Sequence, residues 1–113
     1  NSTEAWIYFV YKKHTGVFNN NGKAVHDFFE TSVTPAGERS FGKHPTQKPV
    51  ALLEKMIELL SNPSDIVFDP FMGSGSTGVA AVKMGRKFIG SEINEEYYNI
   101  SKSRLESVVC ETL

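Results

Sequence analysis

Residues 69–78, which read Asp-Pro-Phe-Met-Gly-Ser-Gly-Ser-Thr-Gly, constrain the fold more than any other segment of the chain. They follow a short apolar run at 66–68, which is typical of a buried strand. Ser76 and Thr77 are suited to open a helix directly after the glycines. The segment therefore predicts a strand, a tight glycine turn and a helix. Because glycine has no Cβ, a ligand can approach such a turn closely, and free N–H groups can point at it.

The segments around this turn extend the alternation of strands and helices. Pro49 suits the first position of a helix that stops at 61–63. A helix from about 76 to 84, ended by Gly85, a strand at 87–92 and a last helix capped by Asn94 follow. The first of these helices is indicated by one apolar stripe: Val50, Leu53, Met56, Ile57 and Leu60. From residue 64 onward, the order predicts two parallel strands joined by a right-handed crossover.

The first 43 residues carry a weaker pattern. The aromatic and β-branched run at 5–11 predicts a strand buried on both faces, and 24–29 could form a second strand. Proline and glycine at 30–43 indicate a loop. We therefore expect one α/β domain over 1–113, with a strand and loop region at 1–43 and a ligand-binding βαβα region at 44–113.

The composition limits the classes of partner and compartment. A formal net charge of -1 gives no general argument for binding a polyanion. The single Cys110 cannot form an internal disulfide, so we expect a reducing, cytoplasmic location. The sequence shows no signal peptide, no apolar run of the ~20 residues that span a membrane, and no Cys/His spacing typical of a metal site. We therefore expect neither a membrane nor a metal partner.

Two acids frame the glycine turn. Asp69 and Glu92 end strands that are expected to be parallel neighbours, so both should lie at the sheet edge where such folds bind ligands. Gly73-x-Gly75-x-x-Gly78 matches the dinucleotide fingerprint, but no Lys-Ser/Thr pair follows it, which argues against a phosphate-binding P-loop. Glu92 can accept hydrogen bonds from both hydroxyls of a ribose. These features fit any adenosine cofactor, NAD included.

Asp69 favours a cofactor that carries a positive charge. A carboxylate at the turn would repel the pyrophosphate of NAD but attract the α-ammonium group of S-adenosylmethionine. Residues 44–49, which read His-Pro-Thr-Gln-Lys-Pro, offer hydroxyl, amide and ammonium donors just before a helix. These donors suit the carboxylate of the same cofactor. S-adenosylmethionine is therefore the cofactor that the residues favour.

Residues 44–49 and 69–78 together resemble the cofactor-binding part of the DNA adenine-N6 and cytosine-N4 methyltransferases, in the circular order called the β class. The segment 90–98, Gly-Ser-Glu-Ile-Asn-Glu-Glu-Tyr-Tyr, is similar too. The resemblance is close over 44–105 and loose over 5–43. It implies an α/β, Rossmann-like S-adenosylmethionine-dependent methyltransferase fold with a mostly parallel sheet, of which this chain is a part.

The resemblance also implies roles for the residues of the turn. Asp69 would bind the α-ammonium group, and Glu92 would hold the ribose. Phe71 would line the cofactor cleft. The backbone at Gly73 and Gly75 would be accessible to the methionine part of the cofactor.

Further roles are implied on either side of the turn. Residues 46–48 would lie near the cofactor carboxylate, and Asn94 would lie near the adenine. The expected cofactor-binding residues are Thr46, Gln47, Lys48, Asp69, Phe71, Gly73, Gly75, Ser76, Thr77, Glu92 and Asn94.

No catalytic residue is expected in this chain. The family grips the target amine of a flipped base with an Asp/Asn/Ser-Pro-Pro-aromatic tetrapeptide, which precedes the cofactor part in the β order. The chain contains no Pro-Pro pair. We therefore expect the cofactor part of a DNA methyltransferase, inactive alone, whose complete form methylates adenine or cytosine in double-stranded DNA.

Two other functions stay open at this point: a non-catalytic cofactor-binding module or split subunit, and a fragment of an NAD-dependent oxidoreductase. In the first case the partner would be the catalytic half or a partner subunit. The strand that ends at Asp69 would have an unpaired edge without further strands, which predicts self-association.

Overall fold

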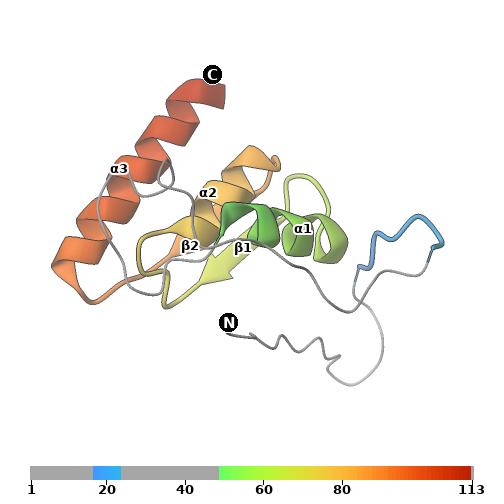
Figure 1. Ribbon diagram of the computed structural model, residues 1–113, viewed down its shortest axis with the longest axis horizontal. Helices are drawn as coiled ribbons and strands as arrows, with labels where there is room; N and C mark the ends of the chain where they lie inside the picture. The colour runs from blue at the N-terminus through green and yellow to red at the C-terminus, as the bar shows by residue number, and fades with distance from the viewer. Residues whose placement is uncertain (1–16, 24–48, 113) are drawn as a thin grey trace.

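The structure is a computed structural model that describes residues 17–23 and 49–112. Figure 1 shows its elements, which in chain order are α1 (Val50–Leu60), β1 (Ile66–Asp69), α2 (Ser76–Lys83), β2 (Lys87–Gly90) and α3 (Glu95–Thr112). The predicted strand, helix, strand, helix order from residue 64 is therefore confirmed. The strands expected at 5–11 and 24–29 and the loop expected at 30–43 lie outside the described residues.

The two strands form a parallel pair, as predicted. Ile66 lies opposite Lys87 and Asp69 lies opposite Gly90, and α2 makes the crossover between the strands. The second strand ends at Gly90 and not at Glu92, which corrects the prediction. Beyond Gly90 the Ser91 N–H still donates to the Asp69 carbonyl at 3.1 Å, but the Phe71 N–H, which would make the next bond of a parallel pair, donates to the Asp69 side chain instead.

The ends of the helices follow local signals. Asn94 caps α3, because its Oδ1 accepts a hydrogen bond from the Tyr97 N–H at 3.0 Å. Gly85 ends the α2 segment with a φ of 78°, the left-handed conformation expected of a glycine in this place. Pro49 is the N-cap of α1, with an extended ψ of 129°, rather than its first helical residue. Asn94 and Gly85 were therefore identified correctly, while α1 begins one position later than predicted.

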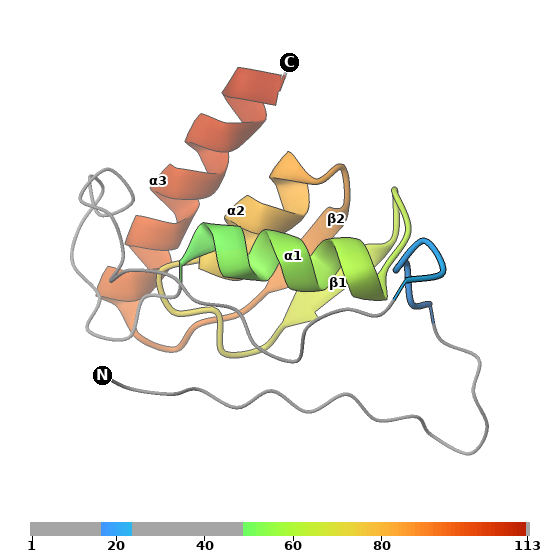
Figure 2. The ribbon, with the colours of Figure 1, turned by 45° about the vertical axis from the view of Figure 1, so that its right-hand side comes forward.

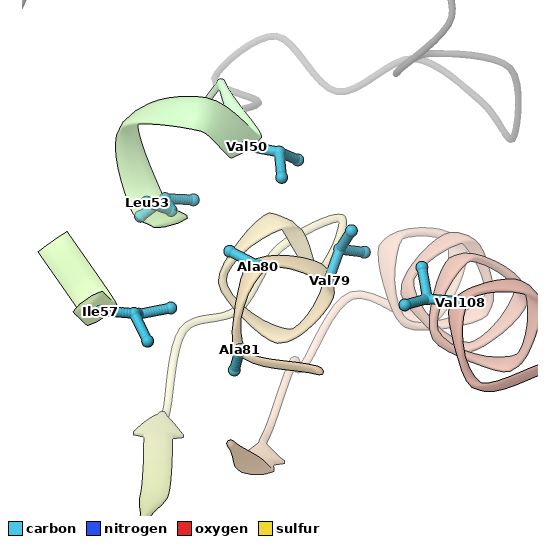
Figure 3. Packing of buried hydrophobic residues seen from close by; sticks show 7 residues of the cluster. All are labelled: Val50, Leu53, Ile57, Val79, Ala80, Ala81 and Val108. Carbon is cyan, nitrogen blue, oxygen red and sulfur yellow. The ribbon is translucent and has the colours of Figure 1, made fainter. Parts of the chain in front are cut away.

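The core forms where α2 lies between α1 and α3 (Figure 3). Ala80 and Ala81 are fully buried at this place, and their small side chains allow the neighbouring elements to come close. Gly78 allows α2 to lie close to the sheet, since a Cβ at this position would lie 2.6 Å from the Phe88 ring. The buried cluster comprises Val50, Leu53, Ile57, Val79, Ala80, Ala81 and Val108. This packing fixes α2, and with it the glycine turn, relative to the sheet.

The sheet has one covered and one uncovered face. Val67 and Phe88 pack against the helical core, and α1 and α2 lie on the same side of the sheet (Figures 1 and 2). On the other face Ile66, Phe68 and Ile89 are 62%, 63% and 55% exposed. We call these three residues the bare sheet face. Within 17–23 and 49–112, none of the helices has the length and apolar character of a membrane-spanning segment.

Candidate functional site

The parallel pairing brings the carboxyl ends of β1 and β2 to one edge of the sheet. Asp69 is the last residue of β1, and Glu92 follows the end of β2 at Gly90. The Glu92 side chain reaches across to Gly73 in the turn that follows Asp69. The structure therefore brings the two predicted acids to the same edge, one on each side of the glycine turn.

The carboxylate of Glu92 is held by two backbone donors. Its Oε1 accepts from the Gly73 N–H at 2.9 Å, and its Oε2 accepts from the Asn94 N–H at 2.8 Å. An ionised carboxylate offers about four acceptor positions, so about two remain for a ligand. Glu92 thus ties the glycine turn to the start of α3 and keeps capacity to accept hydrogen bonds from hydroxyl groups.

The carboxylate of Asp69 is held on one side only. Its Oδ1 accepts from the Phe71 N–H at 3.0 Å, which closes a small turn over Pro70. Among the residues that the structure describes, none donates to its Oδ2. Asp69 therefore presents an oriented negative charge that a cationic group could approach.

The N–H groups of the turn are engaged within the protein, contrary to the expectation that they point freely at a ligand. The Gly75 N–H donates to the Met72 carbonyl at 2.8 Å, and the Met72 N–H donates to the Ser91 carbonyl at 3.0 Å. The Gly73 N–H is used by Glu92. One of these bonds lies within the turn, and the other two join it to the connection between β2 and α3, so these N–H groups are satisfied inside the protein.

The start of α2, unlike the glycine turn, has no side-chain cap. Gly75 is the N-cap of α2 and makes no side-chain cap hydrogen bond, and no acid lies in the first turn. Ser76 and Thr77, which open α2 as predicted, stand at the positive end of its helix dipole. This helix start therefore suits a negatively charged group.

Gly75 is required by packing inside the protein. Its φ is 85°, and a Cβ on it would lie 2.7 Å from the Cβ and 3.1 Å from the Cα of Ser101 in α3. Gly73 also has a positive φ, of 54°. Backbone access for a ligand at these two glycines stays a prediction, while the need for glycine at 75 already follows from the close approach of α3.

Arg104 belongs to this site and was missed in the sequence. It is 4% exposed, and its Nη1 donates to the Ser74 carbonyl at 2.9 Å and to the hydroxyls of Ser74 and Ser76 at 3.1 Å each. The Ser76 hydroxyl therefore faces Arg104 inside the protein. The available signal was the helical spacing of Ile100, Arg104 and Val108, which puts the arginine on a buried stripe.

Two exposed apolar side chains flank the turn. Phe71 is 88% exposed, and Ile93, directly after Glu92, is 101% exposed. Large apolar side chains this exposed beside two carboxylates could pack on the faces of a flat ring. Phe71 was predicted at the site. Ile93 was not predicted, although its position directly after Glu92, the acid expected to bind a ribose, could have indicated that it belongs to the site.

The remaining predicted residues divide into two groups. Asn94 lies at the edge, where its Oδ1 caps α3 and its N–H holds Glu92. Thr46, Gln47 and Lys48 lie outside the described residues. In the described parts of the chain there is no group of three or more His, Cys, Asp or Glu side chains that could hold a metal ion.

This chain is similar in sequence to known proteins. A family model for N6 and N4 methyltransferases, described as DNA methylase, matches residues 3–103. The type II methyltransferase M2.LlaDCHI of Lactococcus lactis subsp. cremoris is 48% identical over 86 residues, which cover 76% of this chain and 32% of that relative. The type II methyltransferase M2.DpnII of Streptococcus pneumoniae is 47% identical over 88 residues, covering 78% of this chain and 33% of that relative. The chain thus spans about a third of the length of these curated relatives.

A solved structure shows the same arrangement of elements. The crystal structure of the M1.HpyAVI–SAM complex matches with a TM-score of 0.71 and 45% identity, over 83% of this chain and 46% of that chain. That neighbour was solved with S-adenosylmethionine.

Proposed function

Because this chain belongs to the DNA methylase family of N6 and N4 methyltransferases, we propose that it is the S-adenosylmethionine-binding part of a DNA amino-methyltransferase. The observation that carries the proposal is the pair of oriented carboxylates, Asp69 and Glu92, on the two sides of the glycine turn. The open oxygen of Asp69 suits a cation and the remaining acceptor positions of Glu92 suit hydroxyl donors, which supports binding of the ammonium group and ribose of this cofactor. NAD has no cation at the corresponding place.

Each exposed group of the edge has a proposed part in binding. The Oδ2 of Asp69 accepts from the α-ammonium group, and the remaining acceptor positions of Glu92 accept from the ribose hydroxyls. Phe71 and Ile93 pack against the adenine, because both are almost fully exposed beside the acids. When bound, the cofactor supplies the methyl group.

The other predicted residues complete the proposed site. Asn94 lies beside the adenine, and its side-chain amide nitrogen is the group available for it, since Oδ1 caps α3. Gly73 and Gly75 shape the turn around the methionine part, with Ser76 and Thr77 at the start of α2. The side chains of Thr46, Gln47 and Lys48 contact the cofactor carboxylate. This last contact rests on the sequence alone.

The activity of the complete protein is a further step of the proposal. The relatives named as methyltransferases are about three times as long as this chain. We therefore propose that the groups that bind the target base belong to sequence outside this chain. The complete protein would bind double-stranded DNA and transfer the methyl group to the exocyclic amine of a flipped adenine or cytosine. A DNA substrate implies an intracellular, cytoplasmic location. The isolated chain would be inactive.

The bare sheet face supports a partner for this chain. Ile66, Phe68 and Ile89 are large, apolar and more than half exposed, and β1 pairs only with β2 among the described strands. We propose that the catalytic half, as part of the same chain or as a split subunit, covers this surface. Alone, the chain should self-associate, and a well-behaved monomer in light scattering would contradict this.

Cofactor binding tests the proposal directly. The 113-residue chain is titrated with S-adenosylmethionine and with NAD, using thermal shift and calorimetry. Stabilisation by S-adenosylmethionine is expected, and stabilisation by NAD alone would refute the proposal. In a second assay with labelled cofactor and DNA, methylation by the isolated chain would show that its expected inactivity is wrong.

A further inference from the structure

The glycine turn is held by two charged side chains of opposite sign. Glu92 accepts from Gly73 on one side of the turn. Arg104 donates to Ser74 and Ser76, which lie on either side of Gly75. We propose that Arg104 is a positioning residue for cofactor binding, which holds the turn in the shape that the ligand requires. This inference rests on the proposed function.

The chemistry of Arg104 fits this role. Its guanidinium stays charged inside the protein, and burying a charge is costly unless hydrogen bonds compensate for it. Here one nitrogen reaches three oxygens, at 2.9, 3.1 and 3.1 Å. Val108, one helical turn further along α3, shows that an aliphatic side chain packs well on the same stripe. Filling the core therefore does not require an arginine at 104.

The contact acts on the backbone that positions the acids. Binding the Ser74 carbonyl fixes the peptide plane between Ser74 and Gly75, and so helps to set the φ of 85° at Gly75. Gly73, the residue before Ser74, donates to Glu92. If Arg104 releases the Ser74 carbonyl, the donor that orients the Glu92 carboxylate moves as well. Loss of Arg104 should therefore weaken cofactor binding without any direct contact to the cofactor.

Arg86 provides a matched control. It is also buried, at 8% exposure, and it also donates to a serine hydroxyl and to backbone carbonyls. Its partners are Ser61 and Met84, which precede the strands at the opposite edge of the sheet. A variant at this position removes a similar set of buried hydrogen bonds far from the glycine turn.

The test compares Arg104→Met, Arg104→Lys and Arg86→Met in the full 113-residue chain, at a temperature where circular dichroism shows each to be folded. Arg104→Met should raise the dissociation constant for S-adenosylmethionine at least tenfold, and Arg86→Met should change it less than twofold. Arg104→Lys keeps the charge and should recover part of the loss. In NMR spectra without ligand, the Gly73 and Gly75 amide resonances should shift in Arg104→Met only.

Unchanged affinity in folded Arg104→Met, or an equal loss in Arg86→Met, would overturn the inference. If Arg104→Met does not fold, Ser76→Ala removes one acceptor of Arg104 and should shift the Gly73 amide resonance in the absence of ligand, which loss of a direct cofactor contact would not do. An unchanged Gly73 resonance in that variant would also overturn the inference. A wild-type chain that does not bind S-adenosylmethionine would instead refute the proposed function, and the glycine amide resonances would then decide the role of Arg104.

Discussion

The β1–β2 sheet has an amino edge, where both strands begin, and a carboxyl edge, where both strands end. Each edge contains a buried arginine and a glycine with positive φ. At the amino edge, Arg86 joins the end of α1 to the end of α2 through Ser61 and Met84. At the carboxyl edge, Arg104 joins α3 to the turn before α2. Each edge also has a glycine with positive φ, Gly85 at 78° and Gly75 at 85°.

The edges differ in what they leave exposed. At the amino edge the two connections bind each other, with the Ser64 N–H on the Gly85 carbonyl and the Lys87 N–H on the Asp65 carbonyl, both at 2.9 Å. At the carboxyl edge, two carboxylates and two almost fully exposed apolar side chains surround the turn. Buried arginines and left-handed glycines therefore support the fold at both edges. The exposed groups are what give one of them its proposed binding function.

The largest expected effect is that of Gly75→Ala on stability. The added Cβ would lie 2.7 Å from Ser101 and the residue would keep a φ of 85°. Overpacking costs about 1–3 kcal/mol and a left-handed conformation about 1–2 kcal/mol. We expect the free energy of unfolding, measured by urea titration, to fall by about 3 kcal/mol. A loss below about 1 kcal/mol would show that α3 does not pack closely on the turn.

The carboxyl edge was largely predictable because its signals are local. The strand, glycine turn and helix follow one another directly in the sequence, so Asp69 and the start of α2 could be placed without tertiary information. Parallel pairing then placed Glu92, and Asn94 and Gly85 were recognisable as cap residues. The family resemblance and the α/β methyltransferase fold are confirmed by the family match and by the solved neighbour.

The parts that could not be predicted depend on contacts between distant residues. Arg104 binds Ser74 across 30 positions, and nothing near either residue signals the other. The end of β2 at Gly90 depends on the turn after its partner strand, where the Phe71 N–H donates to the Asp69 side chain. The internal use of the turn N–H groups depends on Ser91 and Glu92. Local patterns thus identified the elements and the acids, while the contacts that hold the turn required the structure.

The next largest effect is expected for Glu92→Gln on cofactor affinity. A carboxamide presents one acceptor and one donor group, so it cannot accept from both the Gly73 and Asn94 N–H groups. One of these bonds is lost together with part of the ribose contact, which should weaken S-adenosylmethionine binding by about 2 kcal/mol, or roughly 30-fold. Calorimetry measures the change.

Asp65→Asn is the matched control at the amino edge, where Oδ2 of Asp65 accepts from the Asn62 N–H at 2.8 Å. It should leave the dissociation constant unchanged. If both substitutions weaken binding alike, the two edges do not differ in function.

Asp69→Ala should weaken S-adenosylmethionine binding at least tenfold, which is about 1.4 kcal/mol. Asp69→Asn separates charge from shape, because its side-chain oxygen can still accept from the Phe71 N–H. If the α-ammonium group pairs with the carboxylate, Asn should lose nearly as much affinity as Ala. An unchanged dissociation constant in Asp69→Ala would show that the ammonium role is wrong.

The smallest effect is expected for Gly85→Ala, the amino-edge counterpart of Gly75→Ala. A Cβ on Gly85 would meet nothing within 4 Å, so only the left-handed conformation at a φ of 78° is penalised. We expect a loss of about 1 kcal/mol in the free energy of unfolding and no change in cofactor affinity. Because both glycines share the conformational penalty, the difference between the two alanine variants measures the packing of α3 on the turn. Equal losses would mean that the packing of α3 on Gly75 does not contribute to the free energy of unfolding, and that the two edges do not differ in this respect.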